Sequence, residues 1–180
     1  MSHSNLSRLT RSAMLVAVVA VCSQITIPLP SGVPVTLQTL AVALCGYLLG
    51  PLDGVLTLAV YLALGLMGVP VFSAFGAGFG ILLGRTGGFL LGFLPMAFFC
   101  GLAGRQEKRL PQLLLGLPGL VLCHVAGVAQ FSLLTGMGFW ASTLLVSVPY
   151  LVKDVASVLF ASRLALLLDK ALRLRAAKTH

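Results

Sequence analysis

The chain has 180 residues, of which 58% are hydrophobic and only 9% are charged, and its mean hydropathy is +1.05. Soluble domains carry about 25% charged residues, so this composition excludes the soluble globular class and indicates a polytopic membrane protein in a lipid bilayer. The net charge of +8 does not indicate a nucleic-acid-binding protein, because the basic residues lie at the ends of apolar segments, where the positive-inside rule accounts for them.

The predicted fold class is all-α, an integral membrane bundle of six transmembrane helices, with residues 1–180 forming a single integral-membrane domain. In chain order, apolar runs predict helices over residues 12–27, 35–50, 55–67, 85–104, 113–134 and 141–168. The start of the chain also resembles a signal peptide, but the first run stays apolar through Ile27, which favours a retained helix.

The connections between these helices have distinct compositions. Residues 28–34 contain three prolines and are predicted to form a loop, since proline removes a backbone donor and disfavours helix before it. Residues 50–54 predict a tight turn in which Asp53 caps the third helix. The second and third helices are short for a span, which is typical of broken helices around a binding site.

A glycine-rich segment, residues 71–84, predicts a re-entrant or membrane-surface loop between the third and fourth helices. Glycines recur every fourth residue from Gly76 to Gly92, and for the last three this spacing favours close helix packing. The earlier ones could instead line a ligand. Residues 76–80 lack the Lys-Ser/Thr of a phosphate-binding loop, so no ATPase is indicated.

Lys153 and Asp154 interrupt the apolar sixth helix. A charged side chain at the bilayer centre costs about 3 kcal/mol on insertion scales, so such residues usually face a bundle interior or a polar cavity. Neighbours on a helix point about 100° apart, and we therefore expect each of the two to have its own partner from another segment or from a ligand. The alternative is an interhelical ion pair with a structural role.

The basic residues also predict an orientation. They cluster at the start of the chain, in the connector of residues 105–109 and in the tail from residue 169. With six spans, these three clusters lie on the same side of the membrane. Both termini are therefore predicted to be cytoplasmic. Arg163 can reach the inner interface, which leaves Arg85, Lys153 and Asp154 in the outer half with one excess positive charge, suited to a monoanionic ligand. Arg85 could equally reach the outer headgroups.

Other polar and sulfur-containing side chains indicate packing. The four cysteines lie singly in separate apolar runs, with no histidine at metal-ligand spacing, so we expect neither a metal site nor a cofactor. His124 and Gln130 lie six residues apart on the fifth helix and do not share a face. An interhelical hydrogen bond is their predicted role.

Four segments carry a resemblance to a known family. They are residues 33–42 (VPVTLQTLAV), 46–51 (GYLLGP), 65–72 (GLMGVPVF) and 86–93 (TGGFLLGF). Together they resemble the BioY proteins, the biotin-binding S components of energy-coupling-factor (ECF) vitamin importers, and the resemblance covers all six helices in order.

This resemblance implies a bundle in the cell membrane that is not an enzyme and that binds biotin near the extracellular side, beneath the loop joining the first two helices. The implied partners are a transmembrane coupling protein and two cytoplasmic ATPases, and a homo-oligomer stays open. Lys153 and Asp154 match best the basic and acidic ligand-binding residues near the start of the sixth helix. Arg85 stands where many relatives are expected to have proline.

The chemistry of biotin suggests roles for these residues. We expect Asp154 to accept a ureido N–H, while Lys153 and Arg85 pair the valerate carboxylate. Further candidates from the second-helix entrance and the apolar walls are Thr36, Gln38, Phe72, Phe75 and Tyr150. The alternative role for Thr36 and Gln38 is to stabilise the loop. The alternative for the aromatic residues is ordinary packing or a position in the membrane-interface belt.

Ala13, Ala17 and Ala20 form a stripe of small residues on the first helix, at positions i, i+4 and i+7. The resemblance implies that this stripe docks the coupling protein, whereas packing inside the bundle is the alternative.

Three other functions remain open from the sequence. The protein could bind another anionic vitamin, or it could be a membrane scaffold in which Asp154 pairs with Arg85. It could also be a membrane enzyme with Lys153 and Asp154 as base and acid, although the sequence offers no nucleophile–histidine pair, metal cluster or catalytic loop.

Overall fold

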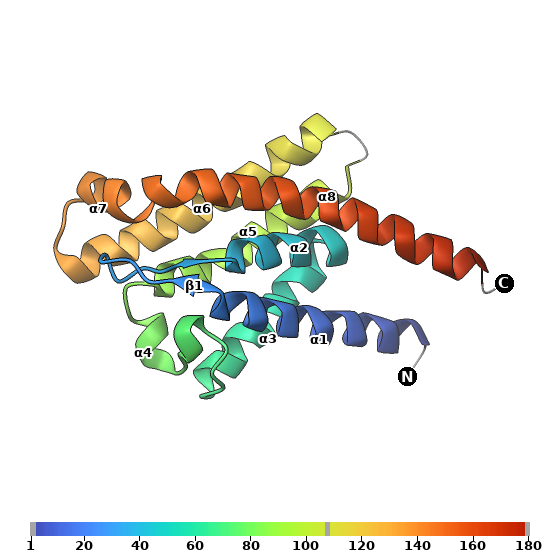
Figure 1. The fold of residues 1–180 in the computed structure, drawn as a ribbon, viewed down its shortest axis with the longest axis horizontal. Coiled ribbons are helices and arrows are strands. Elements are labelled where there is room, and N and C mark those ends of the chain that lie inside the picture. The colour runs from blue at the N-terminus through green and yellow to red at the C-terminus, as the bar shows by residue number, and fades with distance from the viewer. Residues whose placement is uncertain (1–2, 107–108, 179–180) are drawn as a thin grey trace.

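The computed structural model describes residues 3–106 and 109–178 (Figure 1). Its helices are α1 (His3–Gln24), α2 (Gln38–Leu49), α3 (Pro51–Leu66), α4 (Phe79–Leu82), α5 (Gly87–Gly104), α6 (Arg109–Thr135), α7 (Phe139–Val146) and α8 (Val148–Lys178). A 3-10 helix, η1, covers Ser73–Phe75, and two short strands, β1 (Thr26–Ile27) and β2 (Val35–Thr36), pair antiparallel. The predicted helical membrane fold is confirmed.

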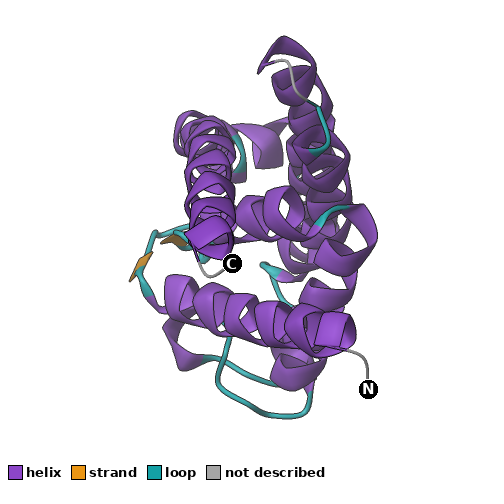
Figure 2. Ribbon diagram, turned by 90° about the vertical axis from the view of Figure 1, so that its right-hand side faces the viewer, coloured by secondary structure: helices purple, strands orange, loops and turns teal. Residues whose placement is uncertain are grey.

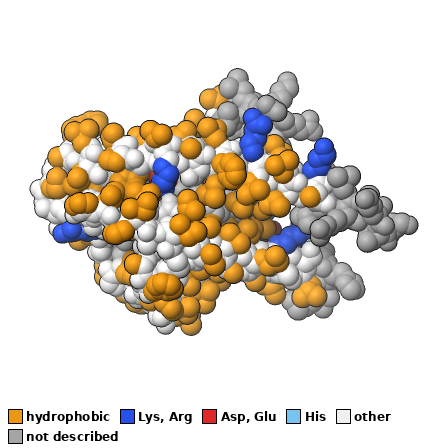
Figure 3. All heavy atoms as spheres, in the orientation of Figure 1, with side chains coloured by type: hydrophobic (Ala, Val, Ile, Leu, Met, Phe, Trp, Pro, Cys, Tyr) orange, Lys and Arg blue, Asp and Glu red, His pale blue; other side chains and the backbone are white. Residues whose placement is uncertain are grey.

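Six apolar helical segments account for the spans. α1, α5 and α6 each contain a stretch long and apolar enough to cross a membrane, and α7 and α8 form one further span that is bent by 55°. α2 and α3 are apolar but shorter. Apolar side chains cover much of the face shown in Figure 3, with only scattered Lys and Arg side chains between them, as expected of a lipid-facing surface.

The core of the bundle centres on α5, which packs against α6, α2 and α3. Gly88 and Gly92 allow this close approach, since a Cβ on Gly92 would lie 2.6 Å from the Cα of Cys123 on α6. A Cβ on Gly88 would collide with the backbone of Ala126 on the same helix. The predicted packing role of these two glycines is therefore confirmed.

The β1–β2 loop and the termini occupy different ends of the bundle. α1 begins and α8 ends at the same end of the molecule, while β1, α4 and α7 lie toward the opposite end (Figure 1). Seen from the end that carries the termini, the strands lie at the margin of the bundle (Figure 2). The segment between α3 and α5 is irregular, as predicted, and Ala74 and Phe75 have φ angles of 54° and 56°.

Two local predictions are wrong. Asp53 does not cap the third helix, because α3 already begins at Pro51 after Gly50, whose φ is +85°. Asp53 instead accepts a bidentate hydrogen bond from Arg8 on α1, at 2.6 and 3.1 Å. The first helix ends at Gln24, and the apolar Thr26–Ile27 pair forms β1.

The sixth helix is also not continuous. It breaks at Ser147 between α7 and α8. Pro149, two residues further on, has no N–H with which to continue the α7 ladder. Of the predicted 105–109 connector, residues 107–108 lie outside the described residues, as do residues 1–2 and 179–180 of the basic termini.

Candidate ligand-binding site

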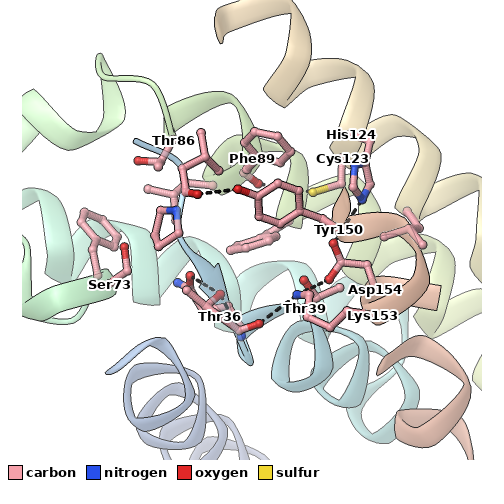
Figure 4. Close-up of a pocket in the computed structure, with 17 residues that line it drawn as sticks. Thr36, Thr39, Ser73, Thr86, Phe89, Cys123, His124, Tyr150, Lys153 and Asp154 are labelled. Atoms are coloured by element: carbon pink, nitrogen blue, oxygen red, sulfur yellow. Dashed lines mark hydrogen bonds and ion pairs between the residues drawn. The ribbon is translucent and has the colours of Figure 1, made fainter. Parts of the chain in front are cut away.

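A pocket lies where the β1–β2 loop meets α2, α5, α6 and the first turns of α8 (Figure 4). Its walls are mainly apolar, as is usual for small-molecule sites. Polar side chains lie on two sides of it, Ser73 and Thr86 on one and Thr39, His124, Lys153 and Asp154 on the other (Figure 4). The cavity measures about 60 Å³, far below the ~300–1,000 Å³ of pockets for drug-sized ligands. A vitamin-sized ligand would therefore require the loop or the lining side chains to move.

The centre of the site is a buried ion pair between Lys153 Nζ and Asp154 Oδ1. Each residue has a partner from another segment, as expected, the Thr36 backbone oxygen for Lys153 and His124 for Asp154. The expectation that the two neighbours cannot also pair with each other is wrong, because the flexible lysine stem lets the ammonium group fold back onto the adjacent carboxylate. Only 7% of the Asp154 side chain is exposed, compared with 26% for Lys153. The carboxylate is thus fixed inside the bundle while the ammonium group reaches the pocket.

His124 on α6 completes this cluster. Its Nε2 lies 3.3 Å from Asp154 Oδ2, and its side chain is only 7% exposed. Its Nδ1 lies 2.9 Å from Ser147 Oγ, at the break between α7 and α8. His124 therefore makes the interhelical hydrogen bonds that the sequence predicts, but it also lines the pocket.

Hydrogen-bonding capacity remains in the pair for a ligand. Lys153 has three N–H donors and uses two, on Asp154 and on the backbone oxygen of Thr36 at 2.8 Å. Asp154 has about two acceptor positions on each oxygen, and its partners are Lys153, His124 and the Thr39 hydroxyl, which leaves acceptor capacity over. The pair thus presents a donor beside an acceptor.

Side chains from α8 and from the α4–α5 connection hold the β1–β2 loop over the pocket. Tyr150 Oη donates to the backbone oxygen of Val33, and Lys153 holds Thr36 as described. Arg85 makes a longer hydrogen bond, 3.4 Å, to the backbone oxygen of Ser31. The loop is consequently tied to the same helix that carries the charge pair.

Gln38 supports the other wall. Its Nε2 donates to Tyr61 Oη at 2.7 Å, which in turn donates to the backbone oxygen of Val71 at 2.8 Å. Thr36 Oγ1 donates to Gln38 Oε1 at 3.2 Å. This chain of hydrogen bonds joins β2, α2, α3 and the segment before η1, so Gln38 and Thr36 stabilise the backbone around the pocket as well as line it.

Comparison with known proteins shows which family the sequence belongs to. The sequence model described as "BioY family" matches residues 1–174. The chain belongs to the BioY family. "Biotin transporter BioY2" from Lactococcus lactis is 33% identical, with 96% of this chain and 95% of the relative covered. "Probable biotin transporter BioY" from Pyrococcus horikoshii is 36% identical, with 84% and 92% covered.

A solved structure has the same fold. It is titled "Crystal structure at 2.1 A of the S-component for biotin from an ECF-type ABC transporter". Its TM-score is 0.85 at 24% identity, over 94% of this chain and 95% of that one. The helical membrane architecture of this BioY-family chain is thereby shared with a solved structure.

The structure brings together six of the eight ligand-binding residues predicted for this BioY-family chain. The pocket is lined by Thr36, Gln38, Phe72, Tyr150, Lys153 and Asp154. Phe72 is fully buried and packs edge-on against Tyr61, at 5.7 Å between ring centroids. It therefore combines a pocket wall with ordinary core packing.

Arg85 and Phe75 are not among the lining residues. The Phe75 side chain is 72% exposed, because the left-handed conformation of residues 74 and 75 turns it away from the bundle. Arg85 is exposed at the loop margin. The scaffold alternative predicts an Asp154–Arg85 pair, but Asp154 pairs with Lys153 and His124 instead.

Sequence reasoning missed several lining residues, above all His124, Phe89, Thr39 and Cys123. For His124 a signal was present, since an ionisable residue within a membrane span is by default a candidate for a functional site. The others resemble ordinary core residues in the sequence, and only the packing of α2, α5 and α6 shows that they face the pocket.

The alanine stripe divides in two. Ala13 and Ala17 are exposed on α1, whereas Ala20 is half-buried and packs against the core. The outer part of the stripe is therefore free to contact another protein, and the inner part packs within the bundle.

Proposed function

We propose that this chain is the biotin-binding membrane subunit, or S component, of an ECF-type importer. The observation that carries the proposal is the buried Lys153–Asp154–His124 cluster in a pocket covered by the β1–β2 loop. The names of the BioY relatives, which are biotin transporters, support biotin as the ligand. On this assignment the chain binds and carries its ligand and is not an enzyme.

The ureido ring of biotin suits the charge pair. The ring offers N–H donors beside a carbonyl acceptor, and the pair offers free acceptor positions on Asp154 beside a free N–H on Lys153. We therefore place the ureido group there, instead of the valerate carboxylate that the sequence alone assigns to Lys153. Phe72 and Tyr150 would flank the fused rings.

The valerate carboxylate of biotin would then point toward the margin of the β1–β2 loop. Arg85 is exposed there, and within the described residues its side chain makes one long hydrogen bond, 3.4 Å to the backbone oxygen of Ser31, so its guanidinium group can turn toward an anion. Phe75 has no role in this arrangement.

The proposed assembly includes a transmembrane coupling protein and two cytoplasmic ATPases. The exposed Ala13–Ala17 face of α1 is the proposed docking surface, since small residues permit close helix contact. Both termini are proposed to face the cytoplasm of the cell, because Arg8, Arg11 and Arg105 lie at or near the helix ends on that side.

Titration calorimetry of biotin into the purified, detergent-solubilised chain tests the ligand and the site. We expect saturable binding by the wild type, weakened about tenfold or more in Lys153→Ala and Asp154→Asn, since a hydrogen bond to a charged group contributes about 1.5–3 kcal/mol. Arg163→Ala is the matched control, because Arg163 lies on the same helix but is exposed and outside the pocket.

Thermal melts would show that each variant is folded. Absence of biotin binding by the folded wild type would overturn the assignment, and a screen of other anionic vitamins would follow.

A further inference from the structure

His124 connects two parts of the bundle that the broken sixth span separates. It lies on α6, and its two ring nitrogens face Ser147 at the break and Asp154 in α8. Ser147 and Asp154 are seven residues apart, a spacing that puts both on one face of a helix. Phe89 packs edge-on against the imidazole, with an interplanar angle of 88° and ring centroids 5.9 Å apart. Both the position and the plane of the ring are therefore fixed.

The hydrogen-bond partners also determine where the ring carries its proton. Asp154 as a carboxylate can only accept, so the Nε2 that faces it must carry the N–H. In the neutral ring Nδ1 is then the acceptor, and the Ser147 hydroxyl donates to it. Asp154 thus selects the tautomer in which Nε2 donates, and the Ser147 hydroxyl supports it by donating to Nδ1.

We propose that His124 is a positioning residue for ligand binding, which holds the Asp154 carboxylate in the orientation that accepts an N–H of the ligand. The inference rests on the proposed function, in which that ligand is biotin. Without a donor at Nε2, the carboxylate would keep only its contacts with Lys153 and Thr39 and could rotate about its Cβ–Cγ bond. Its free acceptor position would then no longer face the ligand.

Three substitutions separate this role from simple packing. His124→Gln keeps an N–H close to the Nε2 position, while His124→Asn keeps a polar atom close to Nδ1 but cannot reach Asp154. His124→Leu removes both. We expect His124→Asn and His124→Leu to weaken biotin binding about tenfold to a hundredfold, the range for a lost hydrogen bond to a charged group. His124→Gln should restore most of the affinity.

The measurement is calorimetric titration with biotin on the purified full-length chain, with thermal melts on each variant. If His124 acts only in packing, affinity would follow the melting temperature, and Gln and Asn variants of equal stability would bind equally. That result would overturn the proposal. Ser147→Ala provides a second test, since loss of the Nδ1 donor should weaken binding although Ser147 does not line the pocket.

A double-mutant cycle distinguishes this inference from the proposed function. His124→Leu combined with Asp154→Asn should bind no more weakly than Asp154→Asn alone, because His124 acts through Asp154. If the double variant instead lost affinity by the product of the two single-variant losses, the positioning role would be contradicted. Biotin would still be the ligand. Failure of the wild type to bind biotin would instead refute the proposed function itself.

Discussion

At the residue scale, the Lys153–Asp154 pair is a buried ion pair for which the proposed ligand-binding role gives a better reason than stability does. Removing two charges from water costs several kcal/mol each, and their attraction repays this only with good geometry and further hydrogen bonds. His124 and the backbone oxygen of Thr36 provide those bonds here. Well-packed apolar side chains would stabilise such a position as well or better, so we attribute the pair to ligand recognition.

This reasoning predicts opposite effects for single and double replacement. Asp154→Leu leaves the Lys153 ammonium and His124 Nε2 unpaired, and should lower the free energy of unfolding by about 3 kcal/mol. Adding Lys153→Met should recover most of that loss, because no uncompensated charge remains. Both variants should fail to bind biotin. Unfolding in detergent micelles measures the stability, and a double variant no more stable than Asp154→Leu would contradict the argument.

At the scale of elements, the contact between α5 and α6 depends on glycines that leave no room for a side chain. A Cβ on Gly88 would collide with the backbone of Ala126, and the backbone cannot rotate away as a side chain could. By contrast, Gly80 in the short α4 has nothing within 4 Å of an added Cβ. Both positions belong to the series of glycines that recur every fourth residue, but their surroundings differ.

We therefore predict that Gly88→Ala lowers the free energy of unfolding by about 1–3 kcal/mol, the usual cost of overpacking, and reduces the melting temperature. Gly80→Ala is the matched control and should be neutral or stabilising by up to about 1 kcal/mol, since alanine favours helix. Thermal unfolding of the two variants side by side tests this. Equal melting temperatures would mean that α6 shifts to accommodate the methyl group.

At the scale of the whole molecule, the proposed ligand site and the proposed docking surface lie on different parts of the bundle. The pocket lies beneath the β1–β2 loop, whereas the exposed Ala13 and Ala17 lie on the outside of α1. The proposed function therefore requires that the docking surface can be blocked without loss of the ligand site.

Ala17→Trp should fold and bind biotin but should no longer co-purify with the coupling protein and ATPases, because the indole prevents close helix contact. Val18→Trp is the matched control, since Val18 is also exposed but lies about 100° around α1. Ala20→Trp should instead destabilise the chain, because Ala20 packs against the core. Unimpaired co-purification of Ala17→Trp would place the docking surface elsewhere.

The sequence by itself determined the helical membrane class, the six apolar segments and the loop over residues 28–34. These follow from local properties, since hydropathy and proline content act on a stretch of chain whatever surrounds it. The intramembrane charges were equally visible, because a charge within a membrane span requires a polar partner wherever it lies. The break at Ser147 was not predicted, although Pro149 two residues later is a local signal for it.

Only the tertiary structure decided which side chains meet. Asp53 resembles a helix cap in the sequence but binds Arg8, 45 residues earlier. The sequence predicts an interhelical hydrogen bond for His124, but only the structure shows that its partners are Asp154 and Ser147 beside a pocket. Phe75 is largely exposed and does not line the pocket that it was expected to line. Such pairings depend on the rotation and separation of packed helices. Those are set by contacts across the whole bundle, including the close approach of α5 and α6 at Gly88 and Gly92.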